Sequence, residues 1–505
     1  MQLKPVHVAA AVMLFTACSP TILAQNPLLI PGVLEQSTIT LNMQVGTYEF
    51  NEGVVTETYG VNRPILGPTI IVTQGQTADF TVVNNLPDTT TMHWHGIHLA
   101  PEHDGGPYSK IAPGESWNPV FEVMDEAGTY WYHPHLHHMT NHHVSKGLAG
   151  MIWVRDAEEQ ALDLPRTYGI DEFPIVIQTK DFDDEGQIVS PSRADDVLMV
   201  NATIEAVLEV PAQVVRLHLL DGSSERVFNL GFEGDETFQM IATEGGLLEA
   251  PLSLQRLRMA PGERSEWLLD LSGRQGDTLR MMSFASEFPS AVYGAAQPGM
   301  MAGQTMTDYD PNPMNGTDFT VLTLVVTAPT ANPVTSIPTT LDLTNGQPWS
   351  EAEVDMSRVL NMAPATMGST ALDGDFTING AAFDMDVINY TVELDDIEIW
   401  TINNNSPIGH PFHIHDVQFY ILDRDGIAPA PEEAGRKDVV FVPAMTSVRF
   451  ICKFEDFANP DVPYMYHCHM LVHEDGGMMG SFVVVDPNGV ADVDASGASA
   501  FSLYP

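Results

Sequence analysis

The feature that most constrains the fold and function of this chain is a set of four histidine pairs, each with one residue between its two members. The pairs are His93/His95, His133/His135, His413/His415 and His467/His469. On a β-strand, residues i and i+2 point to the same face, so each pair presents two imidazoles side by side. Such a pair can chelate one metal ion or span two, and imidazole suits copper, zinc, iron and nickel. A lone pair is a weak signal, but four pairs, two in the first third of the chain and two in the last, predict a metal centre.

The rest of the sequence has the pattern of an all-β protein. Segments of alternating or β-branched residues recur between turns rich in Gly, Pro, Asn and Asp. Clear examples are residues 38–44, 69–73, 77–83, 175–179, 214–220, 319–326, 397–402 and 481–485. Long stretches of helical periodicity are scarce. Many short strands at this spacing favour sandwiches or barrels.

A faint internal repeat divides the chain into three parts. A strand followed by polar turn residues appears three times, with the first turn residue at Asn84, Asp221 and Asn403. These positions lie about one domain apart. We therefore predict domains at 33–157, 170–328 and 340–488, followed by a small, polar and mobile tail at 489–505.

The N-terminus has the features of an export signal. Lys4 precedes an apolar run at 8–17, and small residues follow it. Because a membrane-spanning helix needs about 20 apolar residues, this run and every later stretch are too short, and we expect no transmembrane segment. Cleavage after Ala24 predicts a signal peptide at 1–24 and a periplasmic or secreted bacterial protein. Residues 15–18 also look somewhat like a lipoprotein processing site, so a lipid anchor at Cys18 is an alternative.

The charge and cysteine content exclude several classes of function. The chain has 67 acidic against 21 basic residues and a formal net charge of −46. Such a field repels phosphate backbones, which excludes nucleic-acid binding by charge, and it disfavours anionic membrane surfaces. With 44% hydrophobic residues the chain is globular and not an acidic disordered segment. Three cysteines cannot form a disulfide framework, and Cys452, inside a predicted strand, is expected to be a buried small hydrophobe.

The last histidine cluster identifies the metal. Cys468, His473 and Met478 are spaced five residues apart, and His410 is available upstream. Two histidines, one thiolate and a weak axial methionine are the ligand set of a blue-copper electron-transfer site. Cys468 also lies between His467 and His469, whose side chains point the other way along a strand. An electron that enters at the cysteine sulfur would therefore have a short covalent route to a second metal cluster.

With these motifs the sequence resembles the multicopper oxidases, from about Leu34 to Asp486. The resemblance implies three cupredoxin-like Greek-key β-barrel domains, with copper sites in the first and third. It implies four copper ions, held position by position as follows. Type 1 copper would take His410, Cys468, His473 and Met478, type 2 would take His93 and His413, and the type 3 pair would take His95, His133, His135, His415, His467 and His469.

Within that family the motifs at 103–107, 147–150 and 473–479 look like those of bacterial laccases and copper-efflux oxidases. This implies that Asp104 and Glu474 deliver protons, since reducing O2 to water needs four protons and carboxylates are suitable donors. It also implies that reducing substrates give electrons through an exposed edge of His473. Asp438 resembles an acidic position near the substrate copper, where it could bind Cu(I) or accept a phenolic proton.

The expected function is a laccase-like oxidase, acting as a monomer on O2 and phenols or aromatic amines. Cu(I) oxidation in copper homeostasis is the alternative, although the third predicted domain has few methionines at 355–385 and no Met-His repeats. A longer methionine-containing loop at 284–314 lies in the second domain, where it could reach the type 1 site or do nothing. A non-enzymatic copper-binding or electron-transfer protein is the alternative from another class. The further histidines His98, His137, His138, His142 and His143 have no assigned role.

Overall fold

The computed structural model describes residues 26–342, 349–368 and 370–488. The predicted signal peptide, with Cys18, and the predicted tail lie outside these residues. Within the described part of the chain, no helix is both long and apolar enough to cross a membrane.

The first β unit consists of two packed sheets. One has the order β2 (Val33–Leu34), β5 (Thr69–Thr73), β11 (Gly150–Arg155), β10 (Gly128–His133), β7 (His93–His95). The other has the order β4 (Val54–Val61), β3 (Thr38–Asn51), β6 (Thr77–Asn85), β8 (Ser116–Trp117), with β9 (Val120–Glu122) also on β6. Strand β6 alternates buried and less buried residues along its length, as the two-residue period of a half-buried strand requires. Two short helices, α1 (Pro101–Asp104) and α2 (Thr140–Lys146), lie in its connections.

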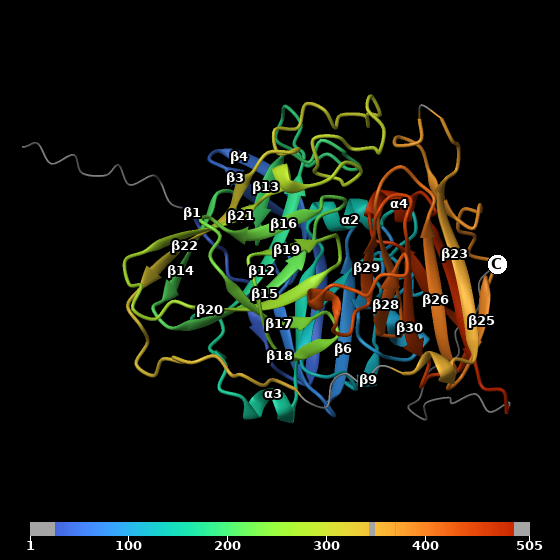
Figure 1. The fold of residues 1–505 in the computed structure, drawn as a ribbon, viewed down its shortest axis with the longest axis horizontal. Coiled ribbons are helices and arrows are strands. Elements are labelled where there is room, and N and C mark those ends of the chain that lie inside the picture. Colours follow the sequence, from blue (N-terminus) through green and yellow to red (C-terminus); the bar gives the residue numbers. More distant parts are fainter. Residues whose placement is uncertain (1–25, 343–348, 369, 489–505) are drawn as a thin grey trace, which may run out of the picture.

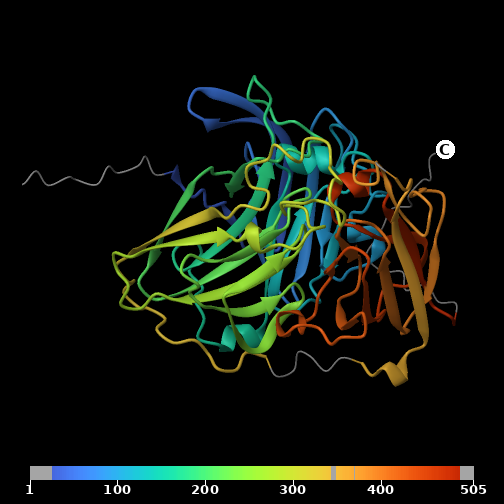
Figure 2. The ribbon, with the colours of Figure 1, turned by 45° about the horizontal axis from the view of Figure 1, so that its top comes forward.

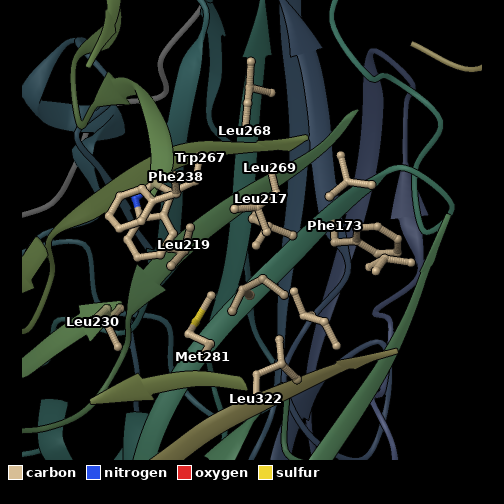
Figure 3. Close-up of a cluster of buried hydrophobic side chains, with 14 of the residues drawn as sticks. Phe173, Leu217, Leu219, Leu230, Phe238, Trp267, Leu268, Leu269, Met281 and Leu322 are labelled. Atoms are coloured by element: carbon tan, nitrogen blue, oxygen red, sulfur yellow. The ribbon is translucent and has the colours of Figure 1, made fainter. Parts of the chain in front are cut away.

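The middle β unit also has two sheets, and it follows the short helix α3 (Ala157–Ala161). One sheet has the order β13 (Val197–Val200), β12 (Glu172–Lys180), β15 (Val214–Asp221), β20 (Arg264–Asp270), β17 (Phe238–Thr243), β18 (Gly246–Leu254). The other has the order β1 (Asn26–Pro27), β14 (Ala206–Pro211), β22 (Phe319–Thr327), β21 (Thr278–Ser283), β16 (Phe228–Phe232), β19 (Arg256–Met259). Figure 3 shows the core between them, where the Trp267 and Phe238 rings stack with centroids 3.6 Å apart. A 3-10 turn, η1 (Ala285–Glu287), opens the loop before β22.

The third β unit repeats the architecture. One sheet has the order β24 (Phe376–Ile378), β23 (Met356–Pro364), β26 (Ile397–Asn404), β30 (Ser447–Lys453), β28 (Phe419–Arg424). The other has the order β25 (Tyr390–Glu393), β32 (Met479–Val485), β31 (Asn459–Cys468), β27 (His410–Ile414), β29 (Val439–Val442). Helix α4 (Leu471–Asp475) connects β31 to β32, and η2 (Glu351–Glu353) and η3 (Pro431–Glu433) are single turns. Cys452 is fully buried in this core.

The internal repeat is present at the predicted positions in the first and middle units, but in the third unit it lies one residue further on. The Asn84 side chain accepts from the N–H of Leu86 and donates to two backbone carbonyls of its unit. Asn404, not Asn403, does the same in the third unit, where it accepts from Ser406 N–H. In the middle unit Asp221 accepts from Ser223 N–H. At the end of each of these three strands, a side-chain oxygen therefore accepts a hydrogen bond from a backbone N–H of the buried turn that follows.

The three units lie against one another (Figures 1 and 2). The middle unit, in green, and the third unit, in orange and red, flank the blue strands of the first. Helices α2 and α4 are neighbours, and the Asp475 carboxylate accepts from the N–H groups of Thr140 and Asn141 at the start of α2. The three pairs of sheets confirm the all-β fold class. The predicted domain boundaries stay a prediction, and β1 pairs with the middle unit.

Candidate metal centre

Strand register brings the histidine pairs together. In the first unit His133 pairs with His93 across β10 and β7, and in the third unit His413 pairs with His467 across β27 and β31. Because side chains alternate along a strand, each pairing aligns one imidazole-bearing face with another. The histidine-bearing strands of the first and third units meet, with the His95 and His413 rings stacked and the Nε2 atoms of His135 and His467 3.0 Å apart.

Three histidine triads result, and their ring nitrogens within each triad lie within 4.8 Å of one another. They are His93/His95/His413, His95/His133/His469 and His135/His415/His467. The shortest contacts include 3.0 Å between the Nε2 atoms of His135 and His467 and 3.3 Å between His469 Nε2 and His95 Nδ1. All eight histidines of the four pairs are thus brought to one buried place.

The outward nitrogen of most rings has a fixed partner. His93 Nδ1 donates to the Asp104 carbonyl at 2.8 Å, and His413 Nδ1 donates to the Asp438 carbonyl at 2.7 Å. His133 and His467 donate to the carbonyls of the residues that follow them. Such outer partners fix the tautomer and orientation of a metal-ligating imidazole.

The inward nitrogens fit a metal. His93 Nε2, His133 Nε2 and His413 Nε2 are buried and have no hydrogen-bond partner among the described residues. Burial lowers the pKa of His469 to about 3 and that of His415 to about 4. These rings are therefore neutral at neutral pH, which is the form that binds copper.

A second ligand set lies on the other face of β31. Cys468 Sγ is 3.6 Å from His410 Nδ1 and 3.7 Å from His473 Nδ1. Met478 is buried in the same core cluster, and its carbonyl accepts from Cys468 N–H while its N–H donates to the His473 carbonyl. The sequence-predicted residues of a soft, cysteine-containing site are thus together. Because Cys468 pairs with Phe412 while His467 pairs with His413, the sulfur and the triads lie on opposite faces of one strand.

The expectation that His473 has an exposed edge is wrong, since this residue is only 2% exposed. The Phe376 ring, with its centroid 4.4 Å from that of the His473 ring, and Glu225 lie against it. The loop that links β21 to β22 in the middle unit packs beside the same site. Its Ala291 carbonyl accepts from Gly409 N–H, and its Met300 N–H donates to the Pro407 carbonyl. Tyr293, Met306 and Tyr309 of this loop belong to the third unit's core cluster, together with Cys468 and Met478. The methionine-containing loop therefore does reach this site.

Two further side chains at this site were missed by the sequence reasoning. Ser406 Oγ lies 2.8 Å from His410 Nε2. Glu225, from the turn after β15 in the middle unit, lies 3.9 Å from His473 Nε2 and is fully buried. Both Glu225 oxygens and His473 Nε2 lack hydrogen-bond partners among the described residues. Burial raises the pKa of Glu225 to about 8.

Asp438 does not lie where the sequence reasoning placed it. It is buried, and its carboxylate contacts His95 Nε2 at 3.2 Å and the Arg264 guanidinium at 2.6 Å. It directly precedes β29, and its carboxylate faces the triads, whereas Ser406 and Glu225 lie beside His410 and His473. The expectation that Asp438 lies near the substrate copper is therefore wrong.

The two predicted proton donors both lie against the triads. Glu474 is buried with its oxygens 3.3 Å from His135 Nδ1 and 3.2 Å from His467 Nδ1. Burial raises the pKa of Glu474 well above its usual range. Asp104 accepts from His415 Nδ1 at 2.8 Å. Burial acts to raise its pKa, but the neighbouring His415 and His93 rings hold it well below the usual range.

The additional histidines lie outside the triads. His98 Nδ1 contacts the Asp416 carbonyl, His138 Nδ1 contacts the Asp475 carbonyl, and His143 Nδ1 contacts Thr90 Oγ1. His137 stacks near His138, and His142 packs on the Tyr59 ring. Each has a partner that explains its position without a metal.

The protonation states predict how metal loading depends on pH. Burial raises the pKa of the Cys468 thiol, whereas burial lowers the pKa of His410 to about 3. Metal binding at this set therefore displaces one proton, from the thiol. The apparent affinity for Co(II), read from its thiolate absorption band, should rise about tenfold per pH unit between pH 6 and 8. A pH-independent affinity would contradict this assignment of the proton.

Comparison with known proteins agrees with this geometry. Family models described as multicopper oxidase match residues 42–159 and 351–488. A multicopper oxidase, mco, of Staphylococcus aureus is 30% identical over 91% of this chain and 93% of its own length. The cell division protein FtsP of Photorhabdus laumondii is 30% identical over 92% of this chain and 93% of its own length.

A solved structure gives the same answer for the fold. The bacterial laccase-like multi-copper oxidase CueO from the lignin-degrading bacterium Ochrobactrum sp. superposes with a TM-score of 0.79. It is 30% identical, and the match covers 91% of this chain and all of that one. Its described activity is towards lignin model compounds and lignosulfonate. Together with the three histidine triads and the Cys468 set, these matches show that the chain belongs to the multicopper oxidase family, an oxidoreductase family that uses copper.

Proposed function

We propose that this protein is a laccase-like oxidase that couples four one-electron oxidations of phenols or aromatic amines to the reduction of O2 to two waters. The observation that carries the proposal is the position of Cys468. One strand places its sulfur in a set with His410 and His473, while its neighbours His467 and His469 belong to the triads on the other face. When bound, copper supplies the electron transfer and the reduction of O2.

We assign four copper ions to these residues. His410, Cys468, His473 and Met478 would hold type 1, and His93 and His413 would hold type 2. His95, His133 and His469 would hold one type 3 ion, and His135, His415 and His467 the other. Two observed triads support the last two sets, and the third triad contains both type 2 residues.

The carboxylates near the triads have different tasks. Burial raises the pKa of Glu474 well above its usual range and the side chain contacts two triad rings, so we propose it as the proton donor for O2 reduction. Asp104 is ionised and accepts from His415 Nδ1, so we propose that it chiefly orients this ring and that of His93.

At the other site, the buried Glu225 is the acidic group beside His473, with one oxygen 3.9 Å from His473 Nε2. A phenol must lose a proton as it loses an electron, and the ionised form of Glu225 could take that proton. Because burial raises the pKa of Glu225 to about 8, this ionised form, which would also attract Cu(I), predominates only above about pH 8. Since His473 is buried and the β21–β22 loop hydrogen-bonds to Pro407 and Gly409 near His410, we propose that the substrate approaches along this loop.

We further propose that the chain is exported and acts as a monomer. The predicted signal peptide supports export, and the lipid anchor on Cys18 remains the alternative to cleavage. Cys452 and Cys468 are both buried and without a disulfide in the described residues, so a disulfide is not part of this proposal.

Oxygen consumption tests the proposed function. The copper-loaded protein should consume one O2 for each four molecules of a simple phenol oxidised by one electron, without releasing hydrogen peroxide. No O2 consumption with phenols, aromatic amines or Cu(I) would instead favour a non-enzymatic role. The likeness to a cell division protein makes this second outcome worth measuring in the same experiment.

Substitutions in the loop between β21 and β22 distinguish oxidation of phenols from oxidation of Cu(I). Met300 and Met301 are 44% and 66% exposed on this loop, where soft thioethers could capture Cu(I). If Cu(I) is a substrate, a double Met300→Ala and Met301→Ala variant should raise KM for Cu(I) about tenfold, as loss of about 1.4 kcal/mol of binding would do. Its kcat for a phenol should not change.

The matched control is Met356→Ala, because Met356 is 48% exposed at the far end of β23. This control should leave both substrates unaffected. Loss of phenol turnover alone in the double variant would contradict a role for the loop in Cu(I) oxidation.

A further inference from the structure

One guanidinium joins all three β units beside the triads. Arg264 begins β20 of the middle unit and is buried. Its Nη1 and Nη2 atoms each donate to the Asp438 carboxylate of the third unit at 2.6 Å. Its Nε donates to the Thr129 carbonyl of the first unit at 2.9 Å. The planar guanidinium therefore has a bidentate partner in one unit and an anchor in another.

The Arg264–Asp438 ion pair continues directly to two triad rings. Asp438 Oδ1 contacts His95 Nε2 at 3.2 Å, and its backbone carbonyl accepts from His413 Nδ1 at 2.7 Å. The His95 and His413 rings are stacked with centroids 3.8 Å apart. One aspartate thus holds the outward nitrogens of two rings that come from different units.

Close packing leaves this arrangement little freedom. Gly96, the neighbour of His95, has a φ of +88°, and a Cβ there would lie 2.3 Å from Asp438 Oδ2 and 2.5 Å from Arg264 Nη2. Gly262, two residues before Arg264, has a φ of +86°, and a Cβ there would lie 2.9 Å from His469 Cγ. The middle unit therefore touches the triads at both the ion pair and the backbone.

We propose that Arg264 is a positioning residue for the triads. Among the described residues the middle unit supplies no member of a triad, yet through Asp438 it sets the orientation of His95 and His413. Copper retention at these rings requires the Arg264–Asp438 ion pair, so the middle unit is part of the metal centre and not a spacer. This inference rests on the proposed binding of copper by the triads.

The charge of Asp438 explains why Arg264 is needed. Apart from Arg264, no lysine or arginine among the described residues forms an ion pair with this buried carboxylate. Without the guanidinium, the carboxylate would lose the bidentate partner that fixes its orientation toward His95. A lysine could restore the charge but not the two parallel hydrogen bonds.

The test compares Arg264→Met with Arg274→Met after copper loading. Arg274, in the same unit, forms an ion pair with Glu236 that is partly exposed, so it is the matched control. We expect Arg264→Met to lose the type 2 electron paramagnetic resonance signal, with copper affinity at the triads about 10- to 100-fold weaker. The blue absorption of the Cys468 site should be retained. Arg274→Met should match the parent protein in both readouts.

Arg264→Lys keeps the test decisive if Arg264→Met does not fold. It should fold, keep the blue absorption, and show altered type 2 hyperfine parameters with weaker copper retention at the triads. Unchanged type 2 parameters in Arg264→Lys, or full copper retention in Arg264→Met, would overturn the inference. If the parent protein itself binds no copper at the triads, the proposed function fails instead.

Discussion

Cys468→Ser is expected to abolish both the intense blue absorption and all oxidase activity. A hydroxyl does not supply the soft thiolate that a blue-copper site needs next to His410 and His473. The substitution also removes the sulfur that begins the covalent route to His467 and His469. The measurement is the visible absorption spectrum, taken together with O2 consumption on a phenol.

Cys452→Ser is the matched control for this prediction. Cys452 is an equally buried free cysteine in β30 of the same unit, and its nearest hydrogen-bond acceptor is the Glu398 carbonyl. We expect this control to keep the blue absorption and the activity per folded chain. Blue absorption or turnover that survives in Cys468→Ser would rule out the assignment of the sulfur.

Glu474→Gln is expected to slow the reduction of O2 by about 10²- to 10⁴-fold, the usual contribution of a positioned proton donor. The amide keeps the shape of the side chain but cannot transfer a proton. Substrate oxidation at the Cys468 site should stay fast, because Glu474 contacts the triad rings of His135 and His467. Stopped-flow mixing of the fully reduced protein with O2 measures the affected step directly.

Asp475→Asn provides the control for Glu474→Gln. The two residues are adjacent in α4, but the Asp475 carboxylate accepts from the N–H groups of Thr140 and Asn141 and has no triad contact among its described hydrogen bonds. Its substitution should lower stability without slowing the reaction with O2. An equal loss of rate in both variants would point to disruption of α4 and not to proton delivery by Glu474.

Much of the metal centre was predictable because it depends on short-range geometry. The two-residue period of a strand places both members of each histidine pair on one face, and it separates Cys468 from His467 and His469. The positions of several strands and the all-β class followed from alternating patterns and turns. The repeat was found one residue out of register in the third unit, because Asn403 and Asn404 are adjacent and only the fold shows which one turns inward.

The residues that were missed or misplaced depend on contacts between units, and such contacts produce no local pattern in the sequence. Glu225 lies in a turn of the middle unit, and nothing in its neighbourhood in the sequence links it to His473. The burial of His473 involves Phe376 and Glu225, which lie far from it in the sequence. Asp438 could have been placed correctly only with knowledge of Arg264, its partner 174 residues away. An arginine in a strand of the middle unit carries no signal of this kind by itself.

Copper analysis of the purified, fully loaded chain tests the proposal of four copper sites most directly. Metal content should reach four copper ions per chain, with a blue band from the Cys468 site, a type 2 resonance, and near-ultraviolet absorption from a coupled type 3 pair. Such a protein should oxidise four electron equivalents of substrate for each O2 consumed. A single copper per chain, with the three histidine triads empty, would contradict the proposed trinuclear centre.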